Sequence, residues 1–257
     1  IYEMSVRDFS MQKEAGFSQP GKFASLSESP TVHGHTFGIK YLQDLGITHV
    51  QLMPVYDFGS VDENHPELVY NWGYDPVQYN VPEGSLSSDP HNPYTRIFEL
   101  QDAIAAYHKA DMSVIMDVVY NHVYEADNYA FEKIVPGYFY RLDERGIRTN
   151  GTFCGNDVAS EKAMVRHYIQ QSVQQWVSLY GFDGFRFDLM GILDITTMKQ
   201  IAQKLKAIYP NIYLYGEGWQ MPTGLDSDLL AHQFNAEQLA EYGFFSDHFR
   251  DTIKQTI

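Results

Sequence analysis

The chain has 257 residues, 44% of them apolar and 15% aromatic, which is enough for one large domain with a substantial core. The formal net charge of −15 excludes most nucleic-acid partners, because they are bound by neutralising phosphates. The single cysteine, Cys154, excludes an internal disulfide. No apolar run is long enough to span a membrane, so we expect no membrane partner.

Predicted strands alternate with predicted helices along the chain. The predicted strands are residues 1–9, 48–55, 112–119, 182–189 and 211–218. The predicted helices are residues 36–45, 98–110, 160–180 (capped by Ser160) and 195–209. Such alternation is typical of a parallel α/β fold, and polar residues gather at the carboxyl ends of the strands. We therefore expect a (β/α)8 TIM barrel of which about the first five β/α units are present, with three strands beyond Ile257.

Three segments lack a clear period. Residues 10–34 and 120–158 are predicted as loops. Residues 56–95 combine five prolines with many aromatic residues, so we expect an ordered insertion that forms part of a cleft. No second domain is evident. Because the chain opens on a strand and closes without a stop signal, we interpret residues 1–257 as part of a longer multidomain enzyme, and its compartment stays open.

Two carboxylates stand at the ends of successive predicted strands. Asp188 follows Arg186 by two residues, so on an extended chain both side chains point to the same face. Glu217 lies between Gly216 and Gly218. One carboxylate paired with an arginine and one unpaired suggest a nucleophile and an acid/base. A structural ion pair at a strand end is an equally compatible interpretation of Asp188 and Arg186.

Other candidates have a structural alternative too. Asp117 lies in an apolar strand and must be paired if it is buried. His122 follows that strand and can be a ligand contact, a metal ligand or a core histidine. Residues 70–76 (YNWGYDP) can stack on a sugar or form a packed loop.

Several motifs together resemble the α-amylase superfamily, glycoside hydrolase family 13. Its first, second and third conserved regions resemble DVVYNH (117–122), GFRFDLMG (184–191) and YGEGW (215–219), and its second-strand motif resembles QLMPV (51–55). YNWGYDP resembles the signature heptapeptide of the type I pullulanases, as do CGND (154–157) and the pattern FRD-x-IK (249–254). Ser5 is a departure, since the first strand of this family more often carries His there.

The resemblance implies roles for six residues. Asp188 would be the nucleophile, Glu217 the general acid/base, and Arg186 would hold Asp188 in its ionised form. The residues that would contact substrate are Tyr74, His122, Arg186 and Trp219. Asn121 matches a position that binds calcium in some amylases, but no calcium site is implied for pullulanases, so we expect no metal or cofactor.

The implied activity is retaining hydrolysis of α-1,6-glucosidic links in pullulan, amylopectin or limit dextrins, with carboxyl groups about 5–5.5 Å apart. One alternative is an α-glucan hydrolase that cleaves α-1,4 links or glycogen branches. Another is a glucan-binding fragment without turnover, because the third catalytic carboxylate of the family, an Asp after a His, is not found. Asp247-His248 has the opposite order and falls too early.

Overall fold

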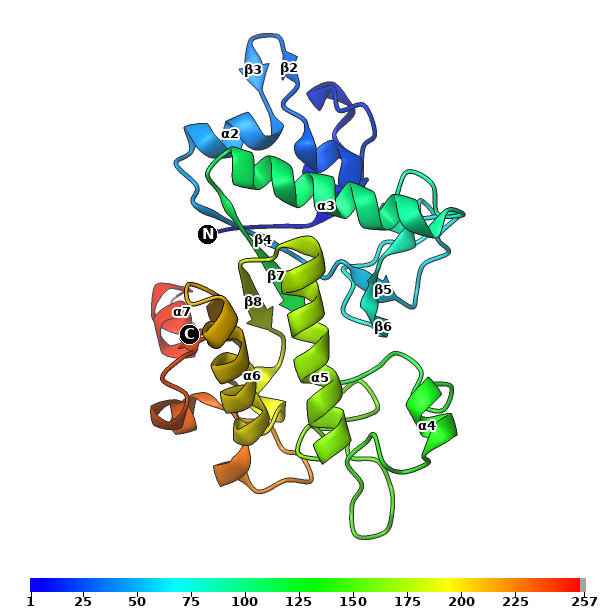
Figure 1. Ribbon diagram of the computed structural model, residues 1–257, viewed down its shortest axis with the longest axis vertical. Helices are drawn as coiled ribbons and strands as arrows, with labels where there is room; N and C mark the ends of the chain where they lie inside the picture. Colours follow the sequence, from blue (N-terminus) through cyan, green and yellow to red (C-terminus); the bar gives the residue numbers. More distant parts are fainter. Residues whose placement is uncertain (255–257) are drawn as a thin grey trace.

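The computed structural model describes residues 1–254, and its centre is a parallel sheet of six strands (Figure 1). Every neighbouring pair is parallel. The strands, in spatial order, are β1 (Tyr2–Met4), β4 (His49–Leu52), β7 (Ser113–Val118), β8 (Gly184–Phe187), β9 (Tyr213–Gly216) and β10 (Gly243–Phe244). Their order in space follows their order in the chain, as in a (β/α)8 barrel, so the predicted partial barrel is confirmed.

The number of strands corrects the sequence-based prediction of five. β10 pairs with β9 through Gly243 opposite Tyr215 and Phe244 opposite Gly216. A strand of two residues is too short to show an apolar run or an alternation of apolar and polar residues, so no sequence pattern predicts it.

Helices follow the strands and cover the outer face of the sheet. Figure 1 shows α5 and α6 side by side beside β8, with α3 crossing above β7. The helices are α1 (Val6–Ser10), α2 (Gly38–Asp44), α3 (Pro93–Lys109), α4 (Ala130–Ile134), α5 (Ala163–Gln175), α6 (Ile195–Ile208) and α7 (Asp247–Lys254). None of these described helices is long and apolar enough to cross a membrane.

Polar side chains decide where several elements begin and end. β1 stops at Met4 rather than at residue 9, because Ser5 caps α1 by accepting the Asp8 N–H at 3.3 Å. α3 begins five residues earlier than predicted, where Asn92 accepts the Tyr94 N–H at 3.1 Å and Pro93 occupies the first turn. These caps account for Ser5 and for the early start of α3.

The helix in the structure differs from the predicted helix 160–180 at both ends. Ser160 does not cap it, since its hydroxyl accepts the Asp194 N–H at 2.9 Å, and α5 begins at Ala163. After Gln175 the chain continues as a π-helical turn, Trp176–Tyr180, and ends at Gly181 with φ of 83°. The sequence pattern therefore located this helix but not its first turn.

The segments predicted as loops contain short elements of their own. Within 56–95, β5 (Tyr56–Phe58) and β6 (Pro76–Pro82) pair in an antiparallel sheet, with Tyr56 and Tyr79 each 1% exposed. Within 10–34, β2 (Thr31–Val32) begins a hairpin with β3 (His35–Thr36). The 3₁₀ turns of the chain are η1 (Lys13–Ala15), η2 (Phe23–Ser27), η3 (Gly84–Leu86), η5 (Met190–Ile192), η6 (Ser227–Leu229) and η7 (Gln233–Gln238).

The two faces of the central sheet differ in character. Met116, Phe187 and Leu214 belong to the hydrophobic core that the helices cover. The strand register places Asp117, Arg186 and Tyr215 side by side on the opposite face. A row of polar side chains therefore runs along the inside of the partial barrel toward the carboxyl ends of the strands.

Candidate active site

Arg186 lies at the centre of a cluster of three carboxylates. Its Nη1 is 2.9 Å from Asp117 Oδ1 and 2.8 Å from Asp188 Oδ1, and its Nη2 is 2.8 Å from Glu217 Oε1. The carboxylates come from β7, from the end of β8 and from the end of β9. Because side chains alternate along a strand, Asp188 lies on the same face as Arg186. One guanidinium thus holds Asp188 and Glu217 together.

Burial and charge act in opposite directions in this cluster. Burial alone would lower the pKa of Arg186, but Asp117, Asp188 and Glu217 together raise it well above its ordinary value. Asp117 is fully buried, and burial raises the pKa of its carboxyl while the Arg186 guanidinium opposes that shift. The Tyr74 hydroxyl donates to Asp117 Oδ2 at 2.8 Å. Asp117 is therefore paired, as a buried carboxyl in an apolar strand has to be.

Asn121 fixes Asp188 from the other side. Its Nδ2 donates to Asp188 Oδ2 at 2.9 Å and to the Asp188 main-chain oxygen at 2.8 Å. Its Oδ1 lies 2.6 Å from His122 Nδ1. Burial lowers the pKa of His122 to about 4, so the ring is neutral at neutral pH. Both ends of the Asn121 carboxamide are thus engaged by protein groups.

The turn after β8 holds Glu217. The Leu189 N–H donates to Glu217 Oε2 at 3.2 Å, and the Gly191 N–H donates to the Glu217 main-chain oxygen at 3.0 Å. The Glu217 N–H donates to the Phe187 oxygen at 3.0 Å. Trp219, two residues after Glu217, is half-buried and has the Arg250 guanidinium 5.5 Å from its ring centroid.

Most of the residues predicted from the sequence come together here. Tyr74 reaches Asp117, and His122 reaches Asp188 through Asn121. Tyr70 and Trp72 of the same heptapeptide are 54% and 59% exposed, and Trp72 Nε1 donates to the Tyr70 hydroxyl at 2.7 Å. Of the heptapeptide rings, Tyr74 is therefore the one that the hydrogen bonds join to the carboxylate cluster.

Three positions that contact this cluster were not assigned from the sequence. Asp117 was expected to need a partner, but its bond to Arg186 depends on the register between β7 and β8. Asn121 was considered as a calcium position rather than as a donor to Asp188. Leu189 contacts Glu217 through its backbone N–H. Because every residue except proline has this group, the residue type gives no sign of the contact. The sequence feature that could have identified Asp117 and Asn121 was their position near the carboxyl end of a predicted strand, where the active sites of barrels lie.

Asp157, the last residue of CGND, joins two loops at the edge of the site. It is fully buried, and its Oδ2 accepts the hydroxyls of Thr149 and Thr223, both at 2.7 Å. The N–H groups of Gly151 and Thr152 donate to the same carboxylate at 2.8 and 2.9 Å. Although burial alone would raise it, these bonds lower the pKa of Asp157 below its ordinary value. The loop after β7 is thereby fastened to the loop after β9.

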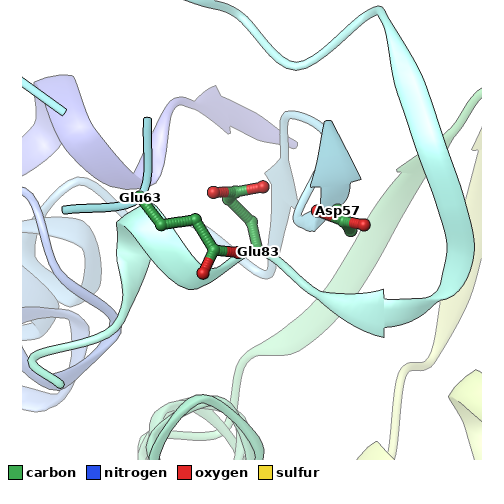
Figure 2. A group of neighbouring side chains, drawn as sticks. All are labelled: Asp57, Glu63 and Glu83. Atoms are coloured by element: carbon green, nitrogen blue, oxygen red, sulfur yellow. The ribbon is translucent and has the colours of Figure 1, made fainter. Parts of the chain in front are cut away.

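Asp57, Glu63 and Glu83 form a second acidic cluster (Figure 2). One carboxylate oxygen from each lies within 4.8 Å of the others. Arg96 donates to both Glu63 oxygens at 2.8 and 2.6 Å, and backbone N–H groups at positions 58 and 85 donate to Glu83 at 3.0 and 2.7 Å. These donors already stabilise two of the three carboxylates, which are also fewer than the six to eight oxygens that calcium takes. We therefore assign no metal to this cluster.

The chain is similar in sequence to known pullulanases. The family model for the α-amylase catalytic domain matches residues 18–137. Pullulanase from Bacillus subtilis (strain 168) is 47% identical over 256 residues, which cover 99% of this chain and 36% of the relative. Pullulanase A from Streptococcus pneumoniae is 36% identical over 274 residues, which cover 99% of this chain and 20% of the relative. The chain thus spans about a third or less of these relatives.

Solved structures agree with the sequence comparison. Pullulanase from Paenibacillus barengoltzii, in complex with maltohexaose and α-cyclodextrin, superposes with a TM-score of 0.95 at 49% identity, over 97% of this chain and 40% of that one. Type I pullulanase from Bacillus subtilis str. 168, in complex with maltose, gives a TM-score of 0.96 at 47% identity, over 98% of this chain and 36% of that one. The strand-end carboxylates, the family model and these likenesses agree, and the chain belongs to the α-amylase superfamily, on its pullulanase branch.

Proposed function

We propose that the full-length gene product carrying this chain is a pullulanase, which hydrolyses α-1,6-glucosidic links in pullulan, amylopectin or limit dextrins. The observation that carries the proposal is the pair of carboxylates, Asp188 and Glu217, bound to one guanidinium at adjacent strand ends. Their side chains are 12% and 22% exposed, so both can meet a substrate from the open side. The similar proteins solved with maltose and maltohexaose support an α-glucan as the ligand.

The proposed reaction is a double displacement. Protonated Glu217 gives its proton to the glycosidic oxygen while a carboxylate oxygen of Asp188 attacks the anomeric carbon. The bond from that carbon to the glycosidic oxygen breaks, and the aglycone leaves as an alcohol. Glu217, now a carboxylate, then takes a proton from water, whose oxygen displaces Asp188 from the sugar. Two inversions leave the anomeric configuration unchanged.

The surrounding residues supply position and charge in this proposal. Arg186 donates to one oxygen of Asp188, and Asn121 donates to the other, so the attacking carboxylate is held in place. Tyr74 stacks on the sugar beside the scissile bond, and its hydroxyl is anchored on Asp117. His122 hydrogen-bonds that sugar, and Trp219 lines the cleft near Glu217.

The test is product analysis with pullulan as the substrate. We expect the full-length gene product to release maltotriose, and the Asp188→Asn variant to lose at least about 10³-fold in rate, as expected when a nucleophile is removed. Release of panose or isopanose would instead assign cleavage of α-1,4 links. Binding of maltooligosaccharide without release of reducing ends, unchanged in Asp188→Asn, would make the protein a glucan-binding module.

We also propose that the reaction needs no metal, since the Asn121 carboxamide is engaged by Asp188 and His122. Dialysis against EDTA is expected to leave the rate on pullulan within about twofold of the untreated enzyme, a change too small to reflect loss of a catalytic ion. Loss of activity that calcium restores would contradict this proposal.

A further inference from the structure

The residue directly after Asp188 has an unusual backbone. Leu189 has φ of 41° and ψ of 45°, in the left-handed region. In that region Cβ crowds the following carbonyl oxygen, so glycine, asparagine and aspartate are the usual residues there. Among residues 1–254, the other non-glycine residues with positive φ are His33, Asp111 and Phe153, and none of them is next to Asp188 or Glu217 in the chain. The chain thus keeps a disfavoured backbone beside its proposed nucleophile.

The left-handed conformation turns the chain without breaking the sheet. The Asp188 N–H still donates to the Val118 oxygen at 2.9 Å, as in a regular parallel ladder. One residue later the chain enters the 3₁₀ turn Met190–Ile192, closed by the Ile192 N–H donating to the Leu189 oxygen at 2.9 Å. A left-handed residue followed by a helical one aims successive N–H groups into one concavity, which suits an anionic group.

Glu217 lies against this turn, through its carboxylate at one N–H and through its main chain at another. It receives the Leu189 N–H on Oε2 at 3.2 Å and the Gly191 N–H on its main-chain oxygen at 3.0 Å. Arg186 binds Oε1 at 2.8 Å, and the Phe187 oxygen accepts the Glu217 N–H at 3.0 Å. All four contacts come from residues 186–191, the same six residues that carry Asp188.

We propose that Leu189 is a positioning residue for Glu217, and that its left-handed backbone fixes where the acid/base stands relative to the nucleophile. This inference rests on the proposed function. If Leu189 left the left-handed region, the turn would open, and the N–H groups of Leu189 and Gly191 would no longer converge on Glu217. Glu217 would then keep Arg186 as its side-chain partner and lose its fixed direction.

The test compares two substitutions in the full-length gene product. Leu189→Val introduces a β-branched side chain, for which the left-handed region is most unfavourable, whereas Leu189→Gly enters that region freely. We expect Leu189→Val to lower kcat on pullulan about 10- to 100-fold with KM within about threefold, since a small displacement of a catalytic group has effects of this size. Leu189→Gly is expected to keep kcat within about threefold of the unsubstituted enzyme.

A substrate with a good leaving group separates positioning of the acid from general damage. An α-maltooligosaccharyl fluoride needs little protonation, so Leu189→Val should release fluoride in the first turnover within about threefold of the unsubstituted enzyme. A merely structural role for Leu189 would slow both substrates alike. Equal loss of kcat in Leu189→Gly and Leu189→Val would also overturn the inference, because the backbone conformation would then not be the cause.

Crystal structures of both variants test the geometry independently of turnover. We expect the Glu217 carboxylate to leave the N–H of residue 189 in Leu189→Val and to keep it in Leu189→Gly. A Glu217 carboxylate that stays in place in both variants would refute the positioning role. An unsubstituted enzyme inactive on pullulan would refute the proposed function alone, since the crystallographic comparison still decides the role of Leu189.

Discussion

Arg186 is one positive charge shared by three carboxylates, and its side chain is only 8% exposed. We predict that Arg186→Lys lowers kcat/KM on pullulan about 100- to 1,000-fold. A lysine ammonium is a compact charge without the planar fork of donors, so it cannot bind Asp117, Asp188 and Glu217 at once. Steady-state kinetics of the full-length gene product measures the effect.

The same substitution at Arg145 is the control for this prediction. Arg145 Nη2 is 2.8 Å from Asp143 Oδ2, a distance like those at Arg186, but its side chain is 76% exposed. Arg145→Lys should keep kcat/KM within about twofold, because exposed ion pairs contribute little. If Arg186→Lys were as active as Arg145→Lys, the three-carboxylate arrangement would not matter for the reaction.

At the level of elements, the turn after β8 packs against the chain after β9 without room for a side chain. A Cβ on Gly191 would lie 1.9 Å from the Trp219 main-chain oxygen, and backbone cannot move aside easily. We predict that Gly191→Ala lowers the free energy of unfolding by about 2–4 kcal/mol, as overpacking in a close contact does. Urea unfolding, followed by tryptophan fluorescence, measures the loss.

Gly34→Ala is the comparison for the packing cost. Gly34 has φ of +80° and no atom within 4 Å of an added Cβ. Alanine at this position therefore costs free energy only through the strained backbone, without any packing clash. We expect a loss of about 1 kcal/mol there, the cost of a left-handed backbone for a residue that has a Cβ. A loss at Gly191 no larger than that at Gly34 would contradict the predicted packing cost, since Gly191 has no positive φ to add a conformational cost.

The sequence located some elements well and others not at all. Strand ends at Asp188 and Glu217 could be predicted because β8 and β9 are short apolar runs that stop at a carboxylate. β10 and β5 could not, because strands of two and three residues carry no period and form only through their neighbours. The seven-residue β6 begins and ends at a proline, and its pairing with β5 is irregular. The links from Arg186 to its three partners depend on register between strands far apart in sequence.

At the scale of the whole molecule, buried carboxyls make stability depend on pH. Burial raises the pKa of Asp57 from 3.8 to about 6 and of Glu83 from 4.5 to about 7. Between about pH 4 and pH 7 the folded protein therefore binds more protons at these groups than the unfolded chain. The contribution of these two groups to the free energy of unfolding is fully present below pH 4 and is lost as the pH rises through 6 and 7. For the fully buried Glu83 the loss is on the order of 3 kcal/mol.

Unfolding temperatures from pH 5 to pH 8 check this prediction in the full-length gene product. The double variant Asp57→Asn, Glu83→Gln should show a flatter decline with pH than the unsubstituted protein. Glu83→Gln also loses an acceptor for a backbone N–H, so the slopes are compared and not the absolute temperatures. Parallel slopes for the two proteins would contradict the assignment.

We predict that residues 1–257 expressed alone are inactive on pullulan and poorly soluble. Within residues 1–254, β1 and β10 each pair on one side only, so two sheet edges are unpaired. Phe249 and Ile253 on α7 are each 65% exposed. Size-exclusion chromatography and a reducing-sugar assay measure the two properties. A monomeric, active preparation of this length would show that the six strands suffice.

The bonds of Asp157 bear on whether the loops beside the carboxylate cluster can be exchanged one at a time. Because one carboxylate binds Thr149 from the loop after β7 and Thr223 from the loop after β9, the two loops keep one common conformation. Arg141 adds a second link, donating to the Thr223 hydroxyl at 3.0 Å. Replacing the loop after β9 alone would remove the Thr223 hydroxyl from the buried Asp157 carboxylate. Replacing the loop after β7 alone would remove Asp157 and Arg141, the two partners of Thr223. An engineered exchange that keeps these bonds has to move the two loops together.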